Sequence, residues 1–406
     1  MDFTFSEEQR AAAEGARGVF AGVAPDAVPS PALTIGAVAE GFDRALWSRL
    51  ADADLLSLLL AEAHGGAGLE AIALCLVLRE AGRVLARVPL LEHCAAAAAV
   101  QAYGGPEQVD RLPARAGRGE LVLTVAAQGR TGHDPAELAV TARREGRVWL
   151  LDGVQTAVPW AFDADLVVVP AHVEGAAGDR TVLALVPREA DGLVLAAQVS
   201  TSGERLAELR LRSVRVDPGE VIEADGAWEW LHGLLVTGTC ALALGLGERV
   251  LRMTAEYAGR REQFGYPIAT FQAVAVQVAD RYIDLRAMEA TLWQAAWRIS
   301  SGAPGALPAA GDVAVAKIWA AEGVRRVVQT AQHLHGGFGA DTDYPLAPLS
   351  RLGQAPGADA RPGGGVRGEA GRPAGRPSAR LTGTQAPPGG REGPGATGRR
   401  PAYRRR

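Results

Sequence analysis

Two long helical stretches of this sequence are joined by Arg261-Glu262-Gln263-Phe264-Gly265-Tyr266-Pro267-Ile268-Ala269-Thr270-Phe271-Gln272. Gly265 is placed to end one helix and Pro267 to begin the next, because glycine follows helix ends and proline favours first turns. A second stretch, His333-Leu334-His335-Gly336-Gly337-Phe338-Gly339, closes a third helical segment. Long helices are therefore predicted over about 228–258, 271–300 and 309–334, as in an antiparallel bundle.

The first stretch supports two interpretations. In one, it only turns the chain, and Phe264 packs into the core. In the other, Arg261 offers a planar guanidinium fork to a pyrophosphate, and Gln263 and Gln272 supply further hydrogen-bond donors.

The second stretch could likewise be a plain glycine-rich helix end, because Gly336 and Gly337 alone are a weak phosphate-binding signal. His333 and His335 are two positions apart and do not share a helix face. No third ligand is evident, so no metal site is predicted. The sequence contains no nucleophile elbow, Walker loop or Rossmann fingerprint.

Upstream, residues 1–118 are predicted to be helical. Ser6 and Gln9 have the spacing of a capping box, in which a hydroxyl and an amide satisfy each other's free backbone donors. Amphipathic stretches then run from Phe42 to Leu60, Glu70 to Leu85 and Leu90 to Tyr103.

From about Leu121 the pattern changes to short runs rich in β-forming residues, separated by polar and glycine-bearing turns. This pattern predicts an antiparallel barrel or sandwich. The runs cover residues 121–125, 139–142, 148–151, 166–169 and 182–186.

At Leu346 the sequence changes character again. Beyond it glycine, proline, arginine and alanine dominate without an apolar period, so this part is predicted to be disordered. The bundle then lacks its fourth helix, which leaves an apolar face uncovered. The predicted fold class is α+β, with an N-terminal helical domain (1–118), a central antiparallel β domain (119–222), a C-terminal helical bundle with its last helix missing or scrambled (223–345) and a low-complexity tail (346–406).

Charge and composition argue against nucleic-acid-binding, secreted and membrane proteins. The tail carries 12 arginines against 3 acidic residues, and the rest of the chain has 30 basic against 43 acidic residues. An acidic body argues against nucleic acid as the main partner. The three cysteines sit in apolar runs, the N-terminus lacks a signal-peptide pattern, and the apolar run 234–246 is too short to span a membrane. These features predict a cytoplasmic protein without a membrane partner.

Taken together, the order R-x-Q-F-G-x-P-I-x-x-F-Q, a long helix pair, H-G-G-x-G and D-Y-P-L resembles the acyl-CoA dehydrogenase family. The start D-F-T-F-S-E-E-Q and the succession of helical, β and helical parts are similar to it too. The resemblance covers about residues 1–346. It is strongest to the subunits paired in heterotetrameric dehydrogenases of bacterial steroid side-chain degradation, on residues 261–272, 279–284, 291–297 and 331–337.

The resemblance implies an FAD-dependent oxidoreductase that removes hydrogens from the α and β carbons of an acyl-CoA. A carboxylate takes the α proton, the β hydride goes to FAD, and an electron-transfer flavoprotein is the expected acceptor. It also implies that certain elements reach the FAD of a neighbouring subunit. In this chain those cofactor-binding positions are Arg261, Gln263, Phe264, Gln272, His333, Gly336 and Gly337, with histidine at position 333 where glutamine is common.

The elements that would serve the chain's own flavin depart from the family pattern. The signature T-E-P-x-x-G-S-D has no clear counterpart in residues 124–134, and the tryptophan beside the flavin maps to about Ala157, with Trp160 nearby. The two family positions of the catalytic carboxylate map to Leu235 and to about Ala360. No catalytic residue is therefore assigned, and Glu229 and Glu248 lie on the same helix as Leu235 at other positions.

The tail is compatible with a shifted reading frame. With suitable codons, removing one base after Leu346 turns the start of the tail into H-R-Y-L-V-W-A-K-H-L-E-L-T-L-G, an amphipathic segment similar to the family's. That segment carries leucine at the usual base position, so the missing carboxylate predates the shift. Resequencing the DNA across codon 346 tests this interpretation.

These observations favour a flavoprotein subunit of acyl-CoA dehydrogenase type that completes the FAD site of a homologous, base-bearing partner in a heterotetramer. A non-functional product that lacks the last bundle helix is one alternative. Two functional alternatives also stay open. One is a self-sufficient homo-oligomeric dehydrogenase with an unrecognised carboxylate such as Glu248. The other is a non-catalytic acyl-CoA-binding or scaffold subunit.

Overall fold

The structure is a computed structural model of the chain, and it describes residues 4–24, 37–127, 138–175, 180–200, 202–302, 305, 307–341 and 343–354. The chain divides into two units, Met1–Gly371 and Arg372–Arg406, and all described residues belong to the first. The predicted tail beyond Gln354 therefore lies outside the described residues.

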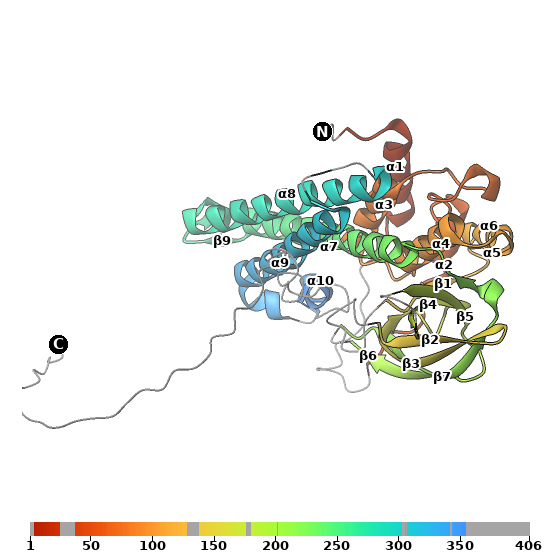
Figure 1. Cartoon of the computed structure of the whole chain (residues 1–406). Helices are drawn as coiled ribbons and strands as arrows, with labels where there is room; N and C mark the ends of the chain where they lie inside the picture. Colours follow the sequence, from red (N-terminus) through yellow and green to blue (C-terminus); the bar gives the residue numbers. More distant parts are fainter. Residues whose placement is uncertain are drawn as a thin grey trace, which may run out of the picture. The chain divides into compact units, whose positions relative to one another are not determined.

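The N-terminal part is helical, as predicted (Figure 1). Ser6 starts the first helix through the predicted capping box: its Oγ accepts from the Gln9 amide N–H at 3.2 Å, and Gln9 Oε1 accepts from the Ser6 N–H at 3.0 Å. The helix predicted from Phe42 is shorter than expected, because the chain turns at Asp54, which has a φ of 56°. The elements are α1 (Glu7–Phe20), α2 (Arg44–Asp52), η1 (Glu62–His64), α3 (Ala71–Val84), α4 (Leu90–Tyr103), α5 (Pro106–Arg111) and α6 (Pro113–Gly117).

The central part is an eight-stranded sheet with the order β6-β7-β3-β2-β4-β5-β8, and β1 pairs with β4. The sheet is mixed, which corrects the antiparallel prediction: the β1–β4 and β2–β4 pairs are parallel. The β2–β3 hairpin returns the chain so that β4 runs in the direction of β1 and β2. The strands are β1 (Leu123–Val125), β2 (Val140–Glu145), β3 (Val148–Pro159), β4 (Leu166–Val173), β5 (Thr181–Pro187), β6 (Leu193–Val199), β7 (Arg205–Val216) and, after η2 (Pro218–Glu220), β8 (Val221–Ile222).

The C-terminal part is built on α7 (Ala227–Arg260), α8 (Gln272–Ser301) and α9 (Ala309–His335), close to the predicted ranges. Helix α7 contacts α3, α4, α8 and α9, and so runs between the two helical parts. It is long and apolar enough to cross a membrane, but 67% of its most apolar window is buried inside the protein, as in a core helix.

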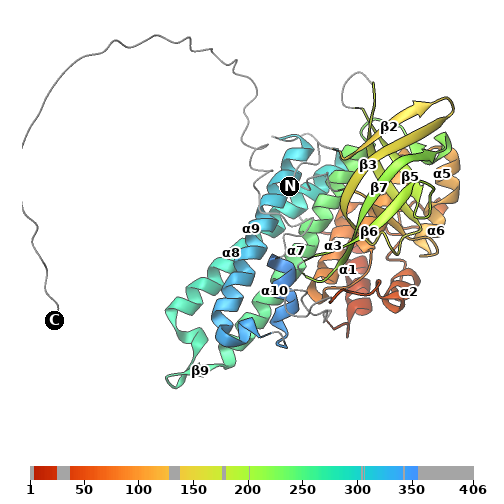
Figure 2. The ribbon, with the colours of Figure 1, turned by 90° about the horizontal axis from the view of Figure 1, so that it is seen from below.

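Helices α3 and α7 cross at very short range. A methyl group at Gly245 would lie 1.9 Å from the Arg79 carbonyl oxygen, and one at Gly82 would lie 2.2 Å from the Leu242 carbonyl oxygen. Both positions require glycine, because the obstacle in each case is backbone. The crossing joins the N-terminal helices to the bundle, with α3 and α7 side by side (Figure 2). One apolar core runs through both parts. A second core lies within the sheet.

A helix stands where the structureless tail was predicted to begin. Helix α10 (Leu346–Gln354) packs on α9 and α7, and the side chains of Leu346 and Leu349 are fully buried. The prediction of disorder from residue 346 is therefore wrong for these nine residues. The helix forms here because Leu346 and Leu349 are spaced i, i+3, which places both side chains on one side of a helical turn.

Candidate functional site

The first motif forms a tight hairpin at the end of α7. The strands β9 (Glu262–Gln263) and β10 (Tyr266–Pro267) pair antiparallel, with Gln263 opposite Tyr266. The two residues between them, Phe264 and Gly265, have φ angles of 56° and 81°. Positive φ at both central positions defines a type I′ turn, which matches the twist of a two-residue hairpin.

The base of this hairpin is fixed by backbone hydrogen bonds. The Arg261 N–H donates to the Tyr257 carbonyl at 2.8 Å, and the Ile268 N–H donates to the Arg261 carbonyl at 2.8 Å. A short turn, η3 (Ile268–Thr270), then leads through Phe271 into α8, so that Gln272 is its first residue. The hairpin is thus held rigidly between two long helices.

Phe264 does not pack into the core, which excludes the first interpretation of this stretch. Its side chain is 90% exposed at the hairpin tip, and its only ring contact among the described residues is Phe271, edge-on at 6.4 Å. A left-handed conformation is unfavourable for a bulky residue, and exposing a whole aromatic ring forgoes its burial. Both costs point to a role outside the folding of this chain.

The polar residues of the motif are also exposed. Arg261, Gln263 and Gln272 all lie on the surface. Within the described residues the Arg261 guanidinium makes no hydrogen bond or ion pair, and Gln263 Nε2 donates only to the adjacent Glu262 carbonyl, at 2.7 Å. The hairpin region therefore exposes the Arg261 guanidinium, two side-chain amides and an aromatic ring as possible contacts for a ligand.

The second motif meets the first through a pair of rings. His335 is buried, and its ring stacks on that of Tyr257, with centroids 4.3 Å apart and planes at 23°. His335 directly precedes Gly336 and Gly337, which are exposed and begin η4 (Gly336–Ala340). Because Tyr257 also binds the Arg261 N–H, the two motifs lie at the same end of the bundle.

His333 is exposed in the last turn of α9. Its carbonyl accepts the Gly336 N–H, and its imidazole makes no ring contact or hydrogen bond with another described residue. Its assignment to the cofactor site stays a prediction.

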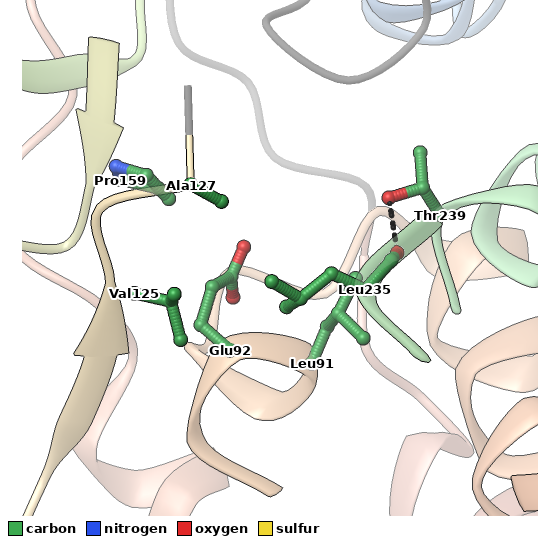
Figure 3. A pocket seen from close by; sticks show the side chains of 7 residues that line it. All are labelled: Leu91, Glu92, Val125, Ala127, Pro159, Leu235 and Thr239. Atoms are coloured by element: carbon green, nitrogen blue, oxygen red, sulfur yellow. Dashed lines mark hydrogen bonds between the residues drawn. The ribbon is translucent and has the colours of Figure 1, made fainter. Parts of the chain in front are cut away.

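A pocket lies at the other end of α7, against the sheet (Figure 3). It is lined by Leu235, to which the sequence prediction maps one of the two family positions of the catalytic carboxylate. The carboxylate of Glu92, on α4, points into the same space and is the only carboxylate among its lining residues. The lining consists of Leu91, Glu92, Val125, Ala127, Pro159, Leu235 and Thr239.

Sequence reasoning missed Glu92. The available signal was a single acidic residue in the otherwise apolar, alanine-rich helix α4. Because this carboxylate points into a pocket, it is a candidate functional group.

The pocket and the hairpin cannot serve the same cofactor within one chain. Leu235 and Arg261 are separated by 26 positions along one continuous helix, which at 1.5 Å per residue places them about 39 Å apart. That span exceeds the length of an extended FAD molecule. Figure 1 shows the same separation, with β9 at one end of α7 and the sheet at the other.

The flavin-adjacent part of the β domain matches the family poorly. Trp160 packs edge-on against Phe42, with centroids 6.3 Å apart, so its ring is engaged by the N-terminal part. Ala157 has a φ of 54° and its N–H donates to Gln198 Oε1 at 2.9 Å. Residues 128–134 of the expected signature lie outside the described residues.

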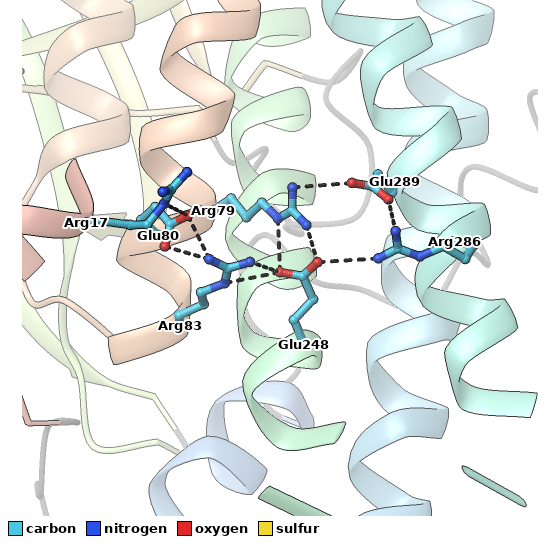
Figure 4. A network of polar contacts seen from close by, with 7 residues as sticks. All are labelled: Arg17, Arg79, Glu80, Arg83, Glu248, Arg286 and Glu289. Carbon is cyan, nitrogen blue, oxygen red and sulfur yellow. Dashed lines mark hydrogen bonds and ion pairs between the residues drawn. The ribbon is translucent and has the colours of Figure 1, made fainter. Parts of the chain in front are cut away.

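Glu248, the carboxylate named for the alternative enzyme, belongs to an ion network between α1, α3, α7 and α8 (Figure 4). Arg79 and Arg83 donate to it, the latter with Nη2 at 2.6 Å. Burial would raise the pKa of Glu248, but the hydrogen bonds and charges of these arginines outweigh it and hold that pKa below its ordinary value. A carboxylate saturated by guanidinium groups is a poor proton acceptor.

The donor set at the hairpin fits FAD. An exposed arginine, two amides and two glycines that would offer open backbone suit a pyrophosphate, and an exposed phenylalanine suits a flat ring. Among the described residues, no group of three or more histidine, cysteine or acidic side chains is arranged to hold a metal ion.

Comparisons with known proteins agree with this geometry. Residues 6–120 match the family model "Acyl-CoA dehydrogenase, N-terminal domain", and residues 237–355 match "Acyl-CoA dehydrogenase, C-terminal domain". Acyl-CoA dehydrogenase FadE27 of Mycobacterium tuberculosis is 37% identical over 353 residues, which cover 85% of this chain and 91% of the relative.

Two solved structures are similar throughout. The crystal structure of the ChsE4-ChsE5 complex from Mycobacterium tuberculosis contains a chain 34% identical to this one, with a TM-score of 0.80, covering 92% of this chain and 100% of that chain. The Tcur3481-Tcur3483 steroid ACAD G363A variant is 36% identical, with a TM-score of 0.80, covering 90% and 97%.

Proposed function

Because the chain belongs to the acyl-CoA dehydrogenase family of FAD-dependent oxidoreductases acting on CH–CH groups, we propose that it is the FAD-completing subunit of a hetero-oligomeric dehydrogenase. A homologous partner subunit carries the catalytic carboxylate. This chain contributes Arg261, Gln263, Phe264, Gln272 and Gly336-Gly337 to the partner's FAD, and His333 lies beside them.

One observation carries the proposal: the FAD-type donors stand exposed about 39 Å along α7 from the chain's own pocket. Donors placed so far from the pocket can complete a site only on another subunit. When bound, FAD would supply the acceptor for the hydride that leaves the β carbon of the substrate. The residues of this chain would hold the cofactor: the Arg261 fork would bind a phosphate, the amides would donate hydrogen bonds, and Phe264 would cover an aromatic ring.

The wider assignment follows from the relatives. The paired subunits named in the ChsE4-ChsE5 complex, and the description "steroid ACAD" of another relative, favour a heterotetramer acting on the acyl-CoA of a steroid side chain. An electron-transfer flavoprotein is the proposed electron acceptor, and the cytoplasm is the proposed location.

The test is co-expression of this chain with a base-bearing homologue from the same genome. We expect the purified chain alone to carry little flavin and no acyl-CoA dehydrogenase activity, and the co-purified complex to carry both. Robust activity of the chain alone overturns the proposal. Tight acyl-CoA binding without flavin, with or without the partner, favours the non-catalytic scaffold instead.

A second candidate is a self-sufficient dehydrogenase that uses Glu92. The observation in its favour is that the Glu92 carboxylate enters the pocket that Leu235 lines, so a carboxylate is present where the family pattern had seemed to leave none. In this function Glu92 takes the α proton of a substrate bound in the pocket of the same chain.

The substitution Glu92→Gln separates the two candidates. If the chain uses its own pocket, the variant retains flavin but loses activity by a factor of about 10³, as expected for a missing general base. In the subunit role, Glu92→Gln leaves the activity of the complex within about twofold of the wild type, because the base belongs to the partner. Glu229→Gln, an exposed carboxylate of α7 outside the pocket, is the matched control.

A further inference from the structure

The hairpin and the Gly336-Gly337 segment are far apart in the sequence but share one residue in space. The carbonyl of Tyr257 accepts the Arg261 N–H, and its ring stacks on His335, which immediately precedes Gly336. The stacking of Tyr257 on His335 therefore links the base of the hairpin to the start of the Gly336-Gly337 segment.

His335 is suited to this purpose and to little else. Its side chain is 2% exposed, and neither ring nitrogen has a hydrogen-bond partner among the described residues. Burial lowers the pKa of His335, which favours the neutral form of the ring. A buried imidazole without hydrogen bonds costs free energy, and what it offers in return is a flat face for stacking.

A third ring connects this contact to α10. Tyr344 lies 5.3 Å from His335 and 5.8 Å from Phe338 between ring centroids. Two residues later α10 begins, anchored by the buried Leu346 and Leu349. Docking of α10 therefore presses Tyr344 against the ring of His335.

We propose that Tyr257, His335 and Tyr344 form an aromatic junction that positions the two FAD-holding elements relative to each other, and that α10 tightens it. The inference rests on the proposed function. In this proposal His335 is a positioning residue that needs no contact with FAD. Helix α10 then contributes to the affinity for the cofactor.

The experiment measures the Kd for FAD, by flavin fluorescence, on the apo form of the complex with the base-bearing homologue. His335→Ala is expected to weaken FAD binding about five- to tenfold, whereas His335→Phe, which keeps a flat ring, stays within about twofold of the wild type. The matched control is Val328→Ala, a fully buried position on the same helix. It should lower Tm and leave the Kd for FAD unchanged.

The junction is overturned if His335→Ala binds FAD as tightly as the wild type, or if Val328→Ala weakens FAD binding equally. Leu349→Ala tests whether α10 contributes to the junction, and we expect it to weaken FAD binding about threefold. If this variant lowers the Tm of the complex but leaves the Kd for FAD unchanged, α10 has no part in the junction. Arg261→Ala distinguishes a failure of the aromatic junction from a failure of the proposed function. If it weakens FAD binding while His335→Ala does not, only the junction fails.

Discussion

In the subunit role, the substitution Arg261→Ala is expected to weaken FAD binding by the complex about 100-fold, the largest functional effect proposed for that role. The guanidinium can make two parallel hydrogen bonds to a phosphate, and each charge-assisted bond is stronger than a neutral one. Because Arg261 is exposed and unpaired within the described residues, its removal costs the folded chain almost nothing. The loss should therefore appear in the Kd for FAD and not in Tm.

Two companion variants sharpen this experiment. Arg261→Lys keeps the charge but not the planar fork, and should fall between wild type and alanine, about tenfold weaker than wild type. Arg260→Ala, the exposed neighbour at the end of α7, should bind FAD normally. If Arg260→Ala weakens binding as much as Arg261→Ala, the effect is one of general positive charge and the assigned role of Arg261 is wrong.

The substitution Glu248→Gln is expected to destabilise the chain by about 2–3 kcal/mol, the largest stability effect of a single charge change here. Its side chain is 9% exposed and pairs with Arg79 and Arg83, which are themselves largely buried. Glutamine fills the same space but removes the charge that the two guanidinium groups share, so that Arg79 keeps only Glu289 and Arg83 only Glu80 as an acidic partner. Denaturant unfolding measures the change, and Glu256→Gln, an exposed position on the same helix, is the control.

The stability difference should depend on pH in a defined direction. The pKa of Glu248 is lowered in the folded chain, so its charged form stabilises the fold above the ordinary carboxyl pKa of 4.5. The advantage of wild type over Glu248→Gln should be complete above that pH and shrink as the pH falls through the lowered pKa. A variant of normal stability that retains flavin but lacks activity would instead make Glu248 the base of a self-sufficient enzyme.

The long helices could be predicted from sequence because their signals are local. The capping box at Ser6 and the breaks around Gly265 and Gly302 mark ends that no tertiary contact has to supply. The parallel pairs of the sheet could not be predicted, because strand direction depends on where the β2–β3 hairpin lands on β4. The helix α10 was missed because nine residues with three leucines are too short a period to recognise beside a glycine-rich tail.

The candidate site divides in the same way. The prediction of FAD binding at Arg261 rests on residue types that the sequence already shows, a planar cation and two amides. The exposure of Phe264 could be learned only from the structure. The same holds for the contact between Tyr257 and His335, because the two residues lie on different helices, α7 and α9. Glu92 was hidden for a further reason: its pocket is assembled from α4, β1, β3 and α7, and no local pattern predicts that convergence.

The central claim is that the FAD-holding surface of this chain serves another subunit, and one titration tests it most directly. FAD is titrated into the apo partner alone, into this chain alone, and into the complex. The account predicts tight binding only in the complex, with one FAD for each partner subunit. Equally tight binding by the partner without this chain, or one tightly bound FAD per molecule of this chain alone, would contradict it.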